Sequence, residues 1–337
     1  MLASELELPG FDTTDGSLRG ERYHEAMSRL RGHDGWLAAC PFGFLILDRE
    51  SAELFLRSRH TTFPGTTIAQ LFGIDQGPLH EEIVCNIISI NGADHRRLRS
   101  LVNPALAPRA VARWRPAMRA ILARLLEAIA PDGRCELVAQ IAKPYPALVI
   151  AAVMGVSERD APALQEWSNL IQRQFDATSL TAQRAALESA VTELYEWIDG
   201  VLADRRPSPG DDLISQLIAA ESERDRLAGD ELRHLVANIL VGGIDTSQSQ
   251  LAHAVRLLAE HPNQWHALRA DPDRLADAAV EEALRHEPIT PFTARITTAE
   301  IEHRGVTFPA GTVVLVSAWH ANRDGAGPDR FEIAATI

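Results

Sequence analysis

Lysine is almost absent from this chain, since Lys143 is the only one and arginine carries nearly all the positive charge. Cysteine is equally scarce: Cys40, Cys85 and Cys135 stand far apart, and no two of them form a CxxC pair. This spacing argues against a zinc or iron–sulfur site built from cysteines, and the odd number argues against a disulfide framework. Aromatic residues make up only 6% of the chain, which favours helices over sheet.

Basic residues are outnumbered by acidic ones, and the net charge is −13. Such an acidic chain is a poor ligand for nucleic acid or for an anionic membrane. The N-terminus has no basic-then-apolar signal pattern, and the most apolar stretch, 148–156, is too short to span a bilayer. We therefore expect a cytoplasmic protein that binds neither nucleic acid nor a membrane. Its 337 residues, 46% of them hydrophobic, are enough for a large core.

Apolar residues recur at three- and four-residue spacing through most of the chain after residue 94, which predicts helices. We expect helices at 94–106, 111–130, 137–155, 161–175, 180–204, 230–260 and 273–286, with one more beginning at 211–212. Short strands are expected at 294–302, 306–308 and 312–317, and a hairpin within 35–48. The segment 65–91 has no sustained period, so we predict a long loop of the kind that forms a binding lid. The fold class is therefore mainly α, with small β regions.

The longest helical pattern, 230–260, is apolar nearly all round, which is typical of a buried helix. Its centre reads Gly242-Gly243-Ile244-Asp245-Thr246. The glycines allow a ligand to lie close to the backbone, and Thr246 can bond to the carbonyl four residues earlier and open the helix. Asp245 is costly in an apolar helix unless it is paired or used in chemistry. The pattern fits a ligand site, or a helix contact on the two glycines with Asp245 in an ion pair.

A second candidate site pairs His95 with Arg99, one helical turn apart, which suits an anion. A solvated basic face explains the same pair. From Arg96 to Arg124 there are eight arginines and no acidic residue. In an acidic chain this segregated basic patch could receive an acidic protein partner.

A third constellation is Glu282 and Arg285, which can pair on one helix face. Such a pair matters only if it is buried, because a surface ion pair contributes little. Other chemistries lack their motifs: the chain has no GxxxxGK[ST], GxGxxG after a strand, HExxH or GxSxG.

The order of the motifs is more informative than any one of them. Six ordered segments strongly resemble the bacterial soluble cytochrome P450 family: DHRRLRSLVNPAL (94–106), PSPGDDLISQLI (207–218), VGGIDTS (241–247), AVEEALRHEP (279–288), ARITTAEIEHRGVTFPAG (294–311) and HANRD (320–324). The resemblance implies a P450-like fold in a single domain over residues 1–337. It also implies a haem-thiolate monooxygenase that inserts one oxygen atom from O2 into a small-to-medium apolar substrate, with electrons from a ferredoxin-type partner.

The resemblance assigns roles to individual residues. His95, Arg99 and Arg295 resemble haem-propionate contacts, and the basic patch from Arg96 to Arg124 resembles the face that docks the electron donor. Asp245 and Thr246 resemble the acid–alcohol pair that delivers protons during oxygen activation. Gly242 and Gly243 resemble the groove over the haem, whereas Glu282 and Arg285 resemble a buried structural pair beneath it. The segments 65–91, 167–175 and 290–294 resemble walls of the substrate pocket.

The sequence departs from the family near its end. The family's haem-ligating cysteine lies in a loop after the HANRD segment, and no cysteine follows Cys135 here. We therefore expect the chain to lack the ligand loop and last helix, which leaves no protein ligand for the metal. It also lacks the arginine or histidine that usually joins the Glu–Arg pair after Phe331. A truncated monooxygenase, a haem-less accessory or binding protein and a weak haem binder with other ligands all fit this ending.

Overall fold

The computed structural model describes residues 1–33, 35–222, 227, 229–325 and 327–334. Its contacts divide the chain into two compact units. Unit 1 comprises Met1–Pro64 and His253–Ile337, and unit 2 comprises Gly65–Ala252. The expectation of a single domain over residues 1–337 stays a prediction, and each unit is described by itself. Within the described ranges, no helix combines the length and apolarity needed to cross a lipid bilayer.

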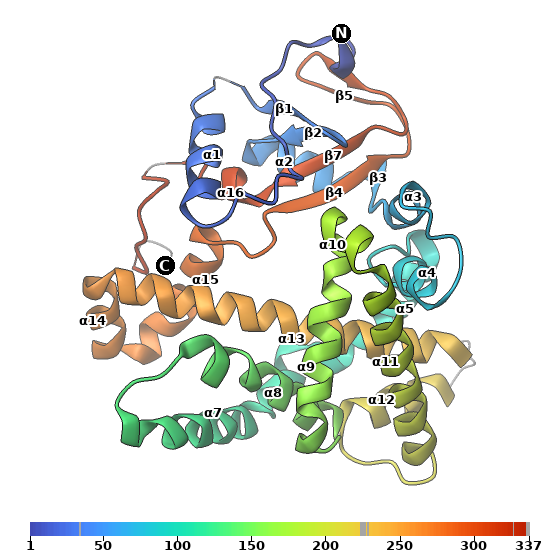
Figure 1. Ribbon diagram of the computed structural model, residues 1–337, viewed down its shortest axis with the longest axis vertical. Coiled ribbons are helices and arrows are strands. Elements are labelled where there is room, and N and C mark those ends of the chain that lie inside the picture. The colour runs from blue at the N-terminus through green and yellow to red at the C-terminus, as the bar shows by residue number, and fades with distance from the viewer. Residues whose placement is uncertain (34, 223–226, 228, 326, 335–337) are drawn as a thin grey trace. The chain divides into compact units, whose positions relative to one another are not determined.

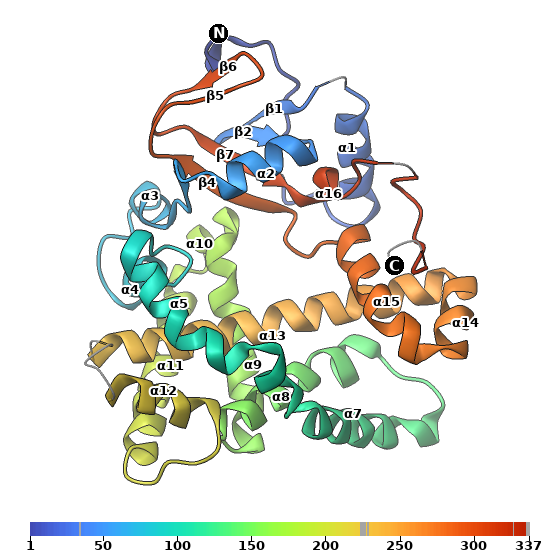
Figure 2. The ribbon, with the colours of Figure 1, turned by 180° about the vertical axis from the view of Figure 1, so that it is seen from behind.

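Unit 1 contains a five-stranded sheet in the order β1-β2-β7-β4-β3 (Figures 1 and 2). In this sheet β2 and β7 pair in parallel, and the other pairs of neighbouring strands are antiparallel. The hairpin predicted within 35–48 is confirmed as β1 and β2. A separate two-stranded sheet pairs β5 with β6. The strands are β1 (Leu37–Cys40), β2 (Gly43–Ile46), β3 (Thr61–Thr62), β4 (Phe292–Thr297), β5 (Ile301–His303), β6 (Val306–Phe308) and β7 (Val313–Ser317).

Gly43 allows β2 to lie close to β7. A Cβ atom at this position would lie 2.1 Å from the carbonyl oxygen of Val313, and φ is +148°. Only glycine fits this combination of conformation and close approach.

The described part of unit 1 also contains helices. They are η1 (Ala3–Glu5), α1 (Glu21–Arg31), α2 (Arg49–Arg57), α14 (Pro262–Ala270), α15 (Pro272–His286) and α16 (Ala318–Ala321). Helix α2 contacts β7 and lies along the sheet in Figure 2. Asp48 caps α2 by accepting a hydrogen bond from the backbone N–H of Ser51 (2.7 Å), and Asp271 caps α15 in the same way.

Unit 2 is helical throughout its described part. Its helices are α3 (Gly65–Leu71), α4 (Pro78–Cys85), α5 (Gly92–Leu106), α6 (Pro108–Ala112), α7 (Arg115–Ile129), η2 (Ala130–Asp132), η3 (Val138–Ala142), α8 (Pro144–Met154), η4 (Glu158–Asp160), α9 (Ala161–Ile171), η5 (Gln172–Phe175), α10 (Ala177–Ala182), α11 (Arg184–Arg205) and α12 (Leu213–Ser222). Helix α9 packs against α8 and α11 around one large apolar core, and α9 and α11 run side by side in Figure 1.

The long helix α13 (Gly229–Glu260) has the extent that the sequence predicts. Its first half is deeply buried, including Leu232, Val236 and Leu240. Beyond Val241 most of its residues are only partly buried, because the sequence becomes polar there. The expectation that the whole helix is buried is therefore wrong for its second half.

Several predicted elements differ in the structure. The helices predicted at 111–130 and 180–204 are each interrupted, the first between α6 and α7 and the second between α10 and α11. The segment 65–91 is not one long loop, since it contains α3 and α4; apolar contacts of these short helices with the core replace the missing sequence period. The strand predicted at 294–302 divides into β4 and β5, which belong to different sheets. The helix predicted at 137–155 begins as the π-helical turn η3 before α8.

Candidate functional site

Thr246 forms a hydrogen bond within the centre of α13. Its hydroxyl donates to the carbonyl oxygen of Gly242 at 2.5 Å. This is the backbone contact that the spacing of the two residues predicts. It fixes the rotamer of Thr246 and occupies a carbonyl oxygen on the turn that carries Asp245.

The neighbouring carbonyl oxygen, that of Val241, is also occupied by side chains. The hydroxyl of Ser168 donates to it at 3.0 Å, and the amide of Gln172 donates at 3.2 Å. Ser168 is 1% exposed, so this is a buried contact between α9 and α13. Two successive carbonyl oxygens of α13 thus bind side-chain donors directly before Asp245.

The two glycines of α13 have different surroundings. A Cβ atom on Gly242 would meet nothing within 4 Å. A Cβ atom on Gly243 would lie 2.7 Å from Cδ1 of Ile150 on α8. Gly242 is therefore the glycine that leaves room against the backbone, whereas Gly243 provides a close helix contact.

Asp245 is half-buried, and burial raises the pKa of its carboxyl group above the ordinary value while the charge of Arg173 opposes this shift. Among the described residues no ion pair involves Asp245. The ion pair considered for it in the sequence is therefore not present there. A carboxyl group with a raised pKa can hold and release a proton nearer neutral pH.

His95 and Arg99 lie one turn apart on α5. His95 is partly buried and Arg99 is exposed, and neither makes an ion pair with another described residue. Arg97, between them, instead binds Glu231 of α13 with a 2.9 Å contact from Nη1. The arrangement leaves the imidazole and one guanidinium available for an anion.

Glu282 and Arg285 form a two-bonded ion pair on α15, with contacts of 2.7 and 2.9 Å. Glu282 is 3% exposed, so the condition that the pair be buried is met. Its Oε1 also accepts from the backbone N–H of Glu332 at 2.8 Å. Here a main-chain donor contacts the carboxylate, and no additional basic side chain is needed. Residues 335–337 lie outside the described residues.

Arg285 also binds three backbone carbonyl oxygens. They belong to Asn322 (3.3 Å), Pro328 (3.1 Å) and Arg330 (2.6 Å). The guanidinium therefore joins α15 to an irregular segment of unit 1 that follows α16.

Arg295 on β4 is half-buried, and its guanidinium donates to the carbonyl oxygen of its neighbour Ala294 (2.8 Å). Burial lowers the pKa of its guanidinium, and within the described ranges no carboxylate pairs with it. A half-buried cation without an acid is costly, so Arg295 fits a propionate.

Burial acts on two of the three cysteines. It raises the pKa of the Cys40 and Cys85 thiols, which favours the protonated form over the thiolate that binds metal. In the described part of the chain, no group of three or more histidine, cysteine or acidic side chains could hold a metal ion.

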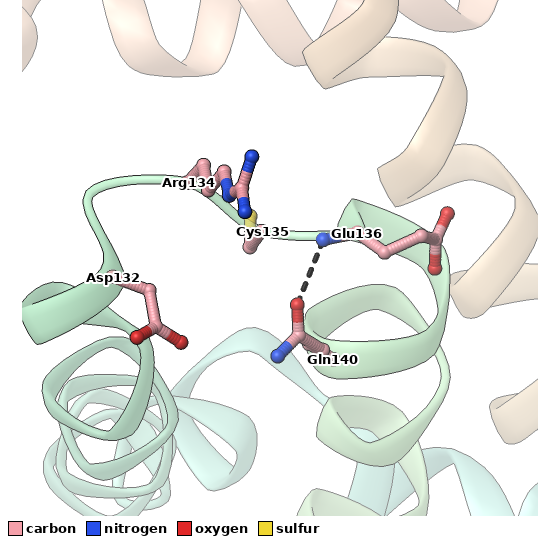
Figure 3. A pocket seen from close by; sticks show the side chains of 5 residues that line it. All are labelled: Asp132, Arg134, Cys135, Glu136 and Gln140. Carbon is pink, nitrogen blue, oxygen red and sulfur yellow. Dashed lines mark hydrogen bonds between the residues drawn. The ribbon is translucent and has the colours of Figure 1, made fainter.

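An exposed hollow next to η2 and η3 contains none of the predicted site residues (Figure 3). The backbone N–H of Glu136 donates to Oε1 of Gln140 across it at 2.7 Å. Its lining side chains are Asp132, Arg134, Cys135, Glu136 and Gln140. This polar, exposed lining is unlike a pocket for an apolar substrate.

The structure places Gly242, Asp245 and Thr246 on one turn and a half of α13, and it places His95 and Arg99 on α5. In unit 1, Glu282 and Arg285 are joined directly, whereas within the described part of the unit no hydrogen bond links them to Arg295. The sequence interpretation missed Ser168 as a donor to α13. The available signal was a small hydroxyl at a position where the helix 161–175 should be apolar.

Comparisons with known proteins agree with this fold. A family model described as Cytochrome P450 matches residues 44–331. Luteothin monooxygenase of Streptomyces thioluteus is 31% identical over 335 residues, which cover 98% of this chain and 81% of that protein. Erythromycin C-12 hydroxylase of Saccharopolyspora erythraea is 34% identical over 251 residues, covering 73% of this chain and 62% of the hydroxylase.

Among solved structures, CalO2 aligns with a TM-score of 0.86 at 28% identity, covering 97% of this chain and 82% of its own. The mainly helical P450 fold predicted from the six ordered segments is thereby confirmed. A match over most of the chain, in sequence and in fold, means that this protein belongs to the cytochrome P450 family of monooxygenases.

Proposed function

We propose that this P450 inserts one oxygen atom from O2 into a small-to-medium apolar substrate. The observation that carries the proposal is the centre of α13, where Thr246 is bonded to Gly242 beside a half-buried Asp245 with a raised pKa. An acid next to a fixed hydroxyl can pass a proton at a defined position. The relatives' names, luteothin monooxygenase and erythromycin C-12 hydroxylase, support an oxygenation.

Haem is the cofactor that the family implies, and when bound it supplies the oxygen-activating chemistry. His95, Arg99 and Arg295 are the residues we assign to its propionates, because each offers a cation or donor without an acid partner. Gly242 leaves space against the backbone, and Gly243 sets the contact with α8. The Glu282–Arg285 pair holds the structure of unit 1 and takes no part in proton transfer.

We assign the substrate pocket to residues 65–91, 167–175 and 290–294. In the second of these segments, the amide of Gln172 donates to the carbonyl oxygen of Val241. Partly buried apolar side chains, among them Ile68, Phe72 and Ile87, remain for contact with an apolar substrate.

We assign the electron donor, a ferredoxin-type protein, to the basic patch from Arg96 to Arg124. Arg97, Arg113 and Arg124 are held in ion pairs. The other five are exposed and form no ion pair with any residue that the structure describes: Arg96, Arg99, Arg109, Arg115 and Arg119. Uncompensated positive charge attracts an acidic partner over a distance. We further propose that the protein acts in the cytoplasm.

Haem titration of the full chain tests the proposal. We expect a haem absorption band that saturates, with affinity lowered about tenfold in Arg295→Gln, since a hydrogen bond to a charged group is lost. Arg269→Gln, an exposed arginine of α14, is the matched control and should bind haem like the wild type. In a chain extended by a loop with the ligand cysteine, the saturated complex should then form hydroxylated product only with reduced ferredoxin and O2. A chain that takes up no haem would instead favour a haem-less binding protein.

A further inference from the structure

A row of hydrogen-bonded polar side chains crosses the apolar core of unit 2, away from the centre of α13. Glu82 of α4 is 1% exposed. Its Oε2 contacts the hydroxyl of Tyr195 on α11 at 2.9 Å, and that hydroxyl lies 3.1 Å from Nδ1 of His234 on α13. Nε2 of His234 lies 3.2 Å from Oε1 of Glu81, which is 40% exposed. The contacts thus connect a buried carboxyl group with a carboxylate at the surface.

The number of protons that these side chains share follows from the geometry of their hydrogen bonds. If Glu82 is protonated, it donates to Tyr195, Tyr195 donates to Nδ1 of His234, and Nε2–H donates to Glu81. If Glu82 gives its proton to Tyr195 while Tyr195 gives its own to Nδ1, a carboxylate and an imidazolium result. Both forms contain the same protons, and in both every donor has an acceptor.

We propose that Glu82 and His234 hold one proton between them through Tyr195, and that these three residues form a latch that fastens α4 to α11 and α13. Further contacts support the latch: Asn86 donates to Oε1 of Glu82 at 3.2 Å, and the backbone N–H of Ile87 donates to Asn238 of α13 at 2.6 Å. Both residues directly follow α4, so its C-terminal end is fixed at several points.

Charged groups surround the latch from each neighbouring helix. Helix α4 contributes Glu81 and Cys85, α11 contributes Asp199, and α13 contributes Asp230, Glu231 and Arg233. Arg233 lies over the ring of Tyr195 and binds Asp199 at 2.7 Å. Helix α3, which packs against α4, has no titratable residue. Arg233 is thus already neutralised by acids, and its charge does not compensate an ionised Glu82.

Burial shifts the two titrating groups toward their neutral forms. It raises the pKa of Glu82 to about 7, and the hydrogen bonds from Tyr195 and Asn86 only partly oppose this shift. It lowers the pKa of His234, although Glu81 acts in the opposite direction. When α4 detaches from α11 and α13, the pKa values of both groups return to their ordinary values, near 4.3 for Glu82 and 6.5 for His234. Between these values the released pair also holds one proton, on His234.

Amide hydrogen exchange of α4, corrected for the intrinsic rates, measures its release at each pH. In the wild type we expect the opening constant to change less than about threefold between pH 5 and 6.5, since opening moves no net proton. In Glu82→Gln, opening should increase about tenfold per unit as the pH falls below 6.5, because released His234 takes up a proton. In His234→Asn, it should increase about tenfold per unit as the pH rises toward 7, because released Glu82 loses one.

Tyr195→Phe tests the bridge itself. We expect α4 to open about tenfold more readily throughout this pH range, since two hydrogen bonds are lost, while Tyr145→Phe on α8 is the matched control and should leave α4 unchanged. Equal exchange in the two phenylalanine variants, or flat profiles in both polar variants, would overturn the proposal. If Tyr195→Phe does not fold, the opposite slopes of the other two variants still decide. None of these measurements requires haem or substrate, so they are independent of the proposed oxygenation.

Discussion

The hydroxyl of Thr246 and the carbonyl oxygen of Gly242 are bonded at 2.5 Å, one turn apart on α13. Replacing Thr246 by alanine removes this hydroxyl from the side of Asp245. In the haem-loaded protein we expect product per O2 consumed to fall about tenfold or more, because proton delivery by a positioned group is lost. Thr246→Ser should keep most of the yield. An unchanged ratio of product to O2 in Thr246→Ala would contradict the role of this pair.

The adjacent glycines should respond differently to the same substitution. Gly242→Ala should stabilise the protein by about 0.5–1 kcal/mol, because alanine is the better helix former and its Cβ meets open space. Gly243→Ala should be at least about 1 kcal/mol less stable than Gly242→Ala, since Ile150 must move. Urea denaturation measures both values. Equal stabilities would mean that the contact with Ile150 relaxes without cost.

The different surroundings of Gly242 and Gly243 show which features the sequence can predict and which it cannot. The ordered segments and the helical period predict α13, its central glycines and the bond of Thr246, because these depend on local spacing. The helices α3 and α4 were missed because they are short and are stabilised by apolar contacts with distant residues. No local pattern could show that Gly243 contacts Ile150, or that Glu82 contacts Tyr195 across 113 positions.

The buried ion pair on α15 should be important for stability. Arg285→Ala removes the basic member of a buried ion pair, since Glu282 is 3% exposed, and we expect a loss of about 3–5 kcal/mol in the free energy of unfolding. Arg274→Ala is the control, because its ion pair with Asp271 is exposed and should contribute less than about 1 kcal/mol. Thermal or chemical denaturation compares the two. Losses of similar size would show that the first pair is not specifically structural.

His320 should make the protein sensitive to acid. It is 3% exposed, its Nε2 contacts the carbonyl oxygen of Met27 (3.1 Å), and its Nδ1 contacts the Ser317 hydroxyl (2.8 Å). These partners fit a neutral ring that donates from Nε2. Burial lowers the pKa of His320 from 6.5 to about 4.

Because the folded pKa lies below the unfolded one, this contribution to stability is complete above pH 6.5 and is lost as the pH falls toward 4. The loss should reach the order of 3 kcal/mol. Denaturation at a series of pH values should show a shallower acid slope for His320→Asn than for the wild type. Parallel slopes would assign the acid sensitivity to other groups.

Electron delivery should depend on the arginines of the basic patch that have no ion pair. Reversing two of them, in Arg109→Glu with Arg119→Glu, should slow reduction by a ferredoxin about tenfold at low salt, and less at high salt. Arg269→Glu on α14 with Arg57→Glu on α2 reverses two exposed arginines outside the patch and is the matched control. Stopped-flow reduction measures the rates. Equal slowing by the control would indicate an effect of net charge alone.

Among the described residues, the hydrogen bonds of Arg285 to the segment after α16 go to main-chain oxygens, those of Asn322, Pro328 and Arg330. These hydrogen bonds to main-chain oxygens do not depend on which side chains Asn322, Pro328 and Arg330 carry. Substitutions along this segment should therefore be tolerated far better than substitutions at Arg285 itself. The sequence of this segment, and even its length, can then differ between homologues while the guanidinium of Arg285 still holds its backbone in place.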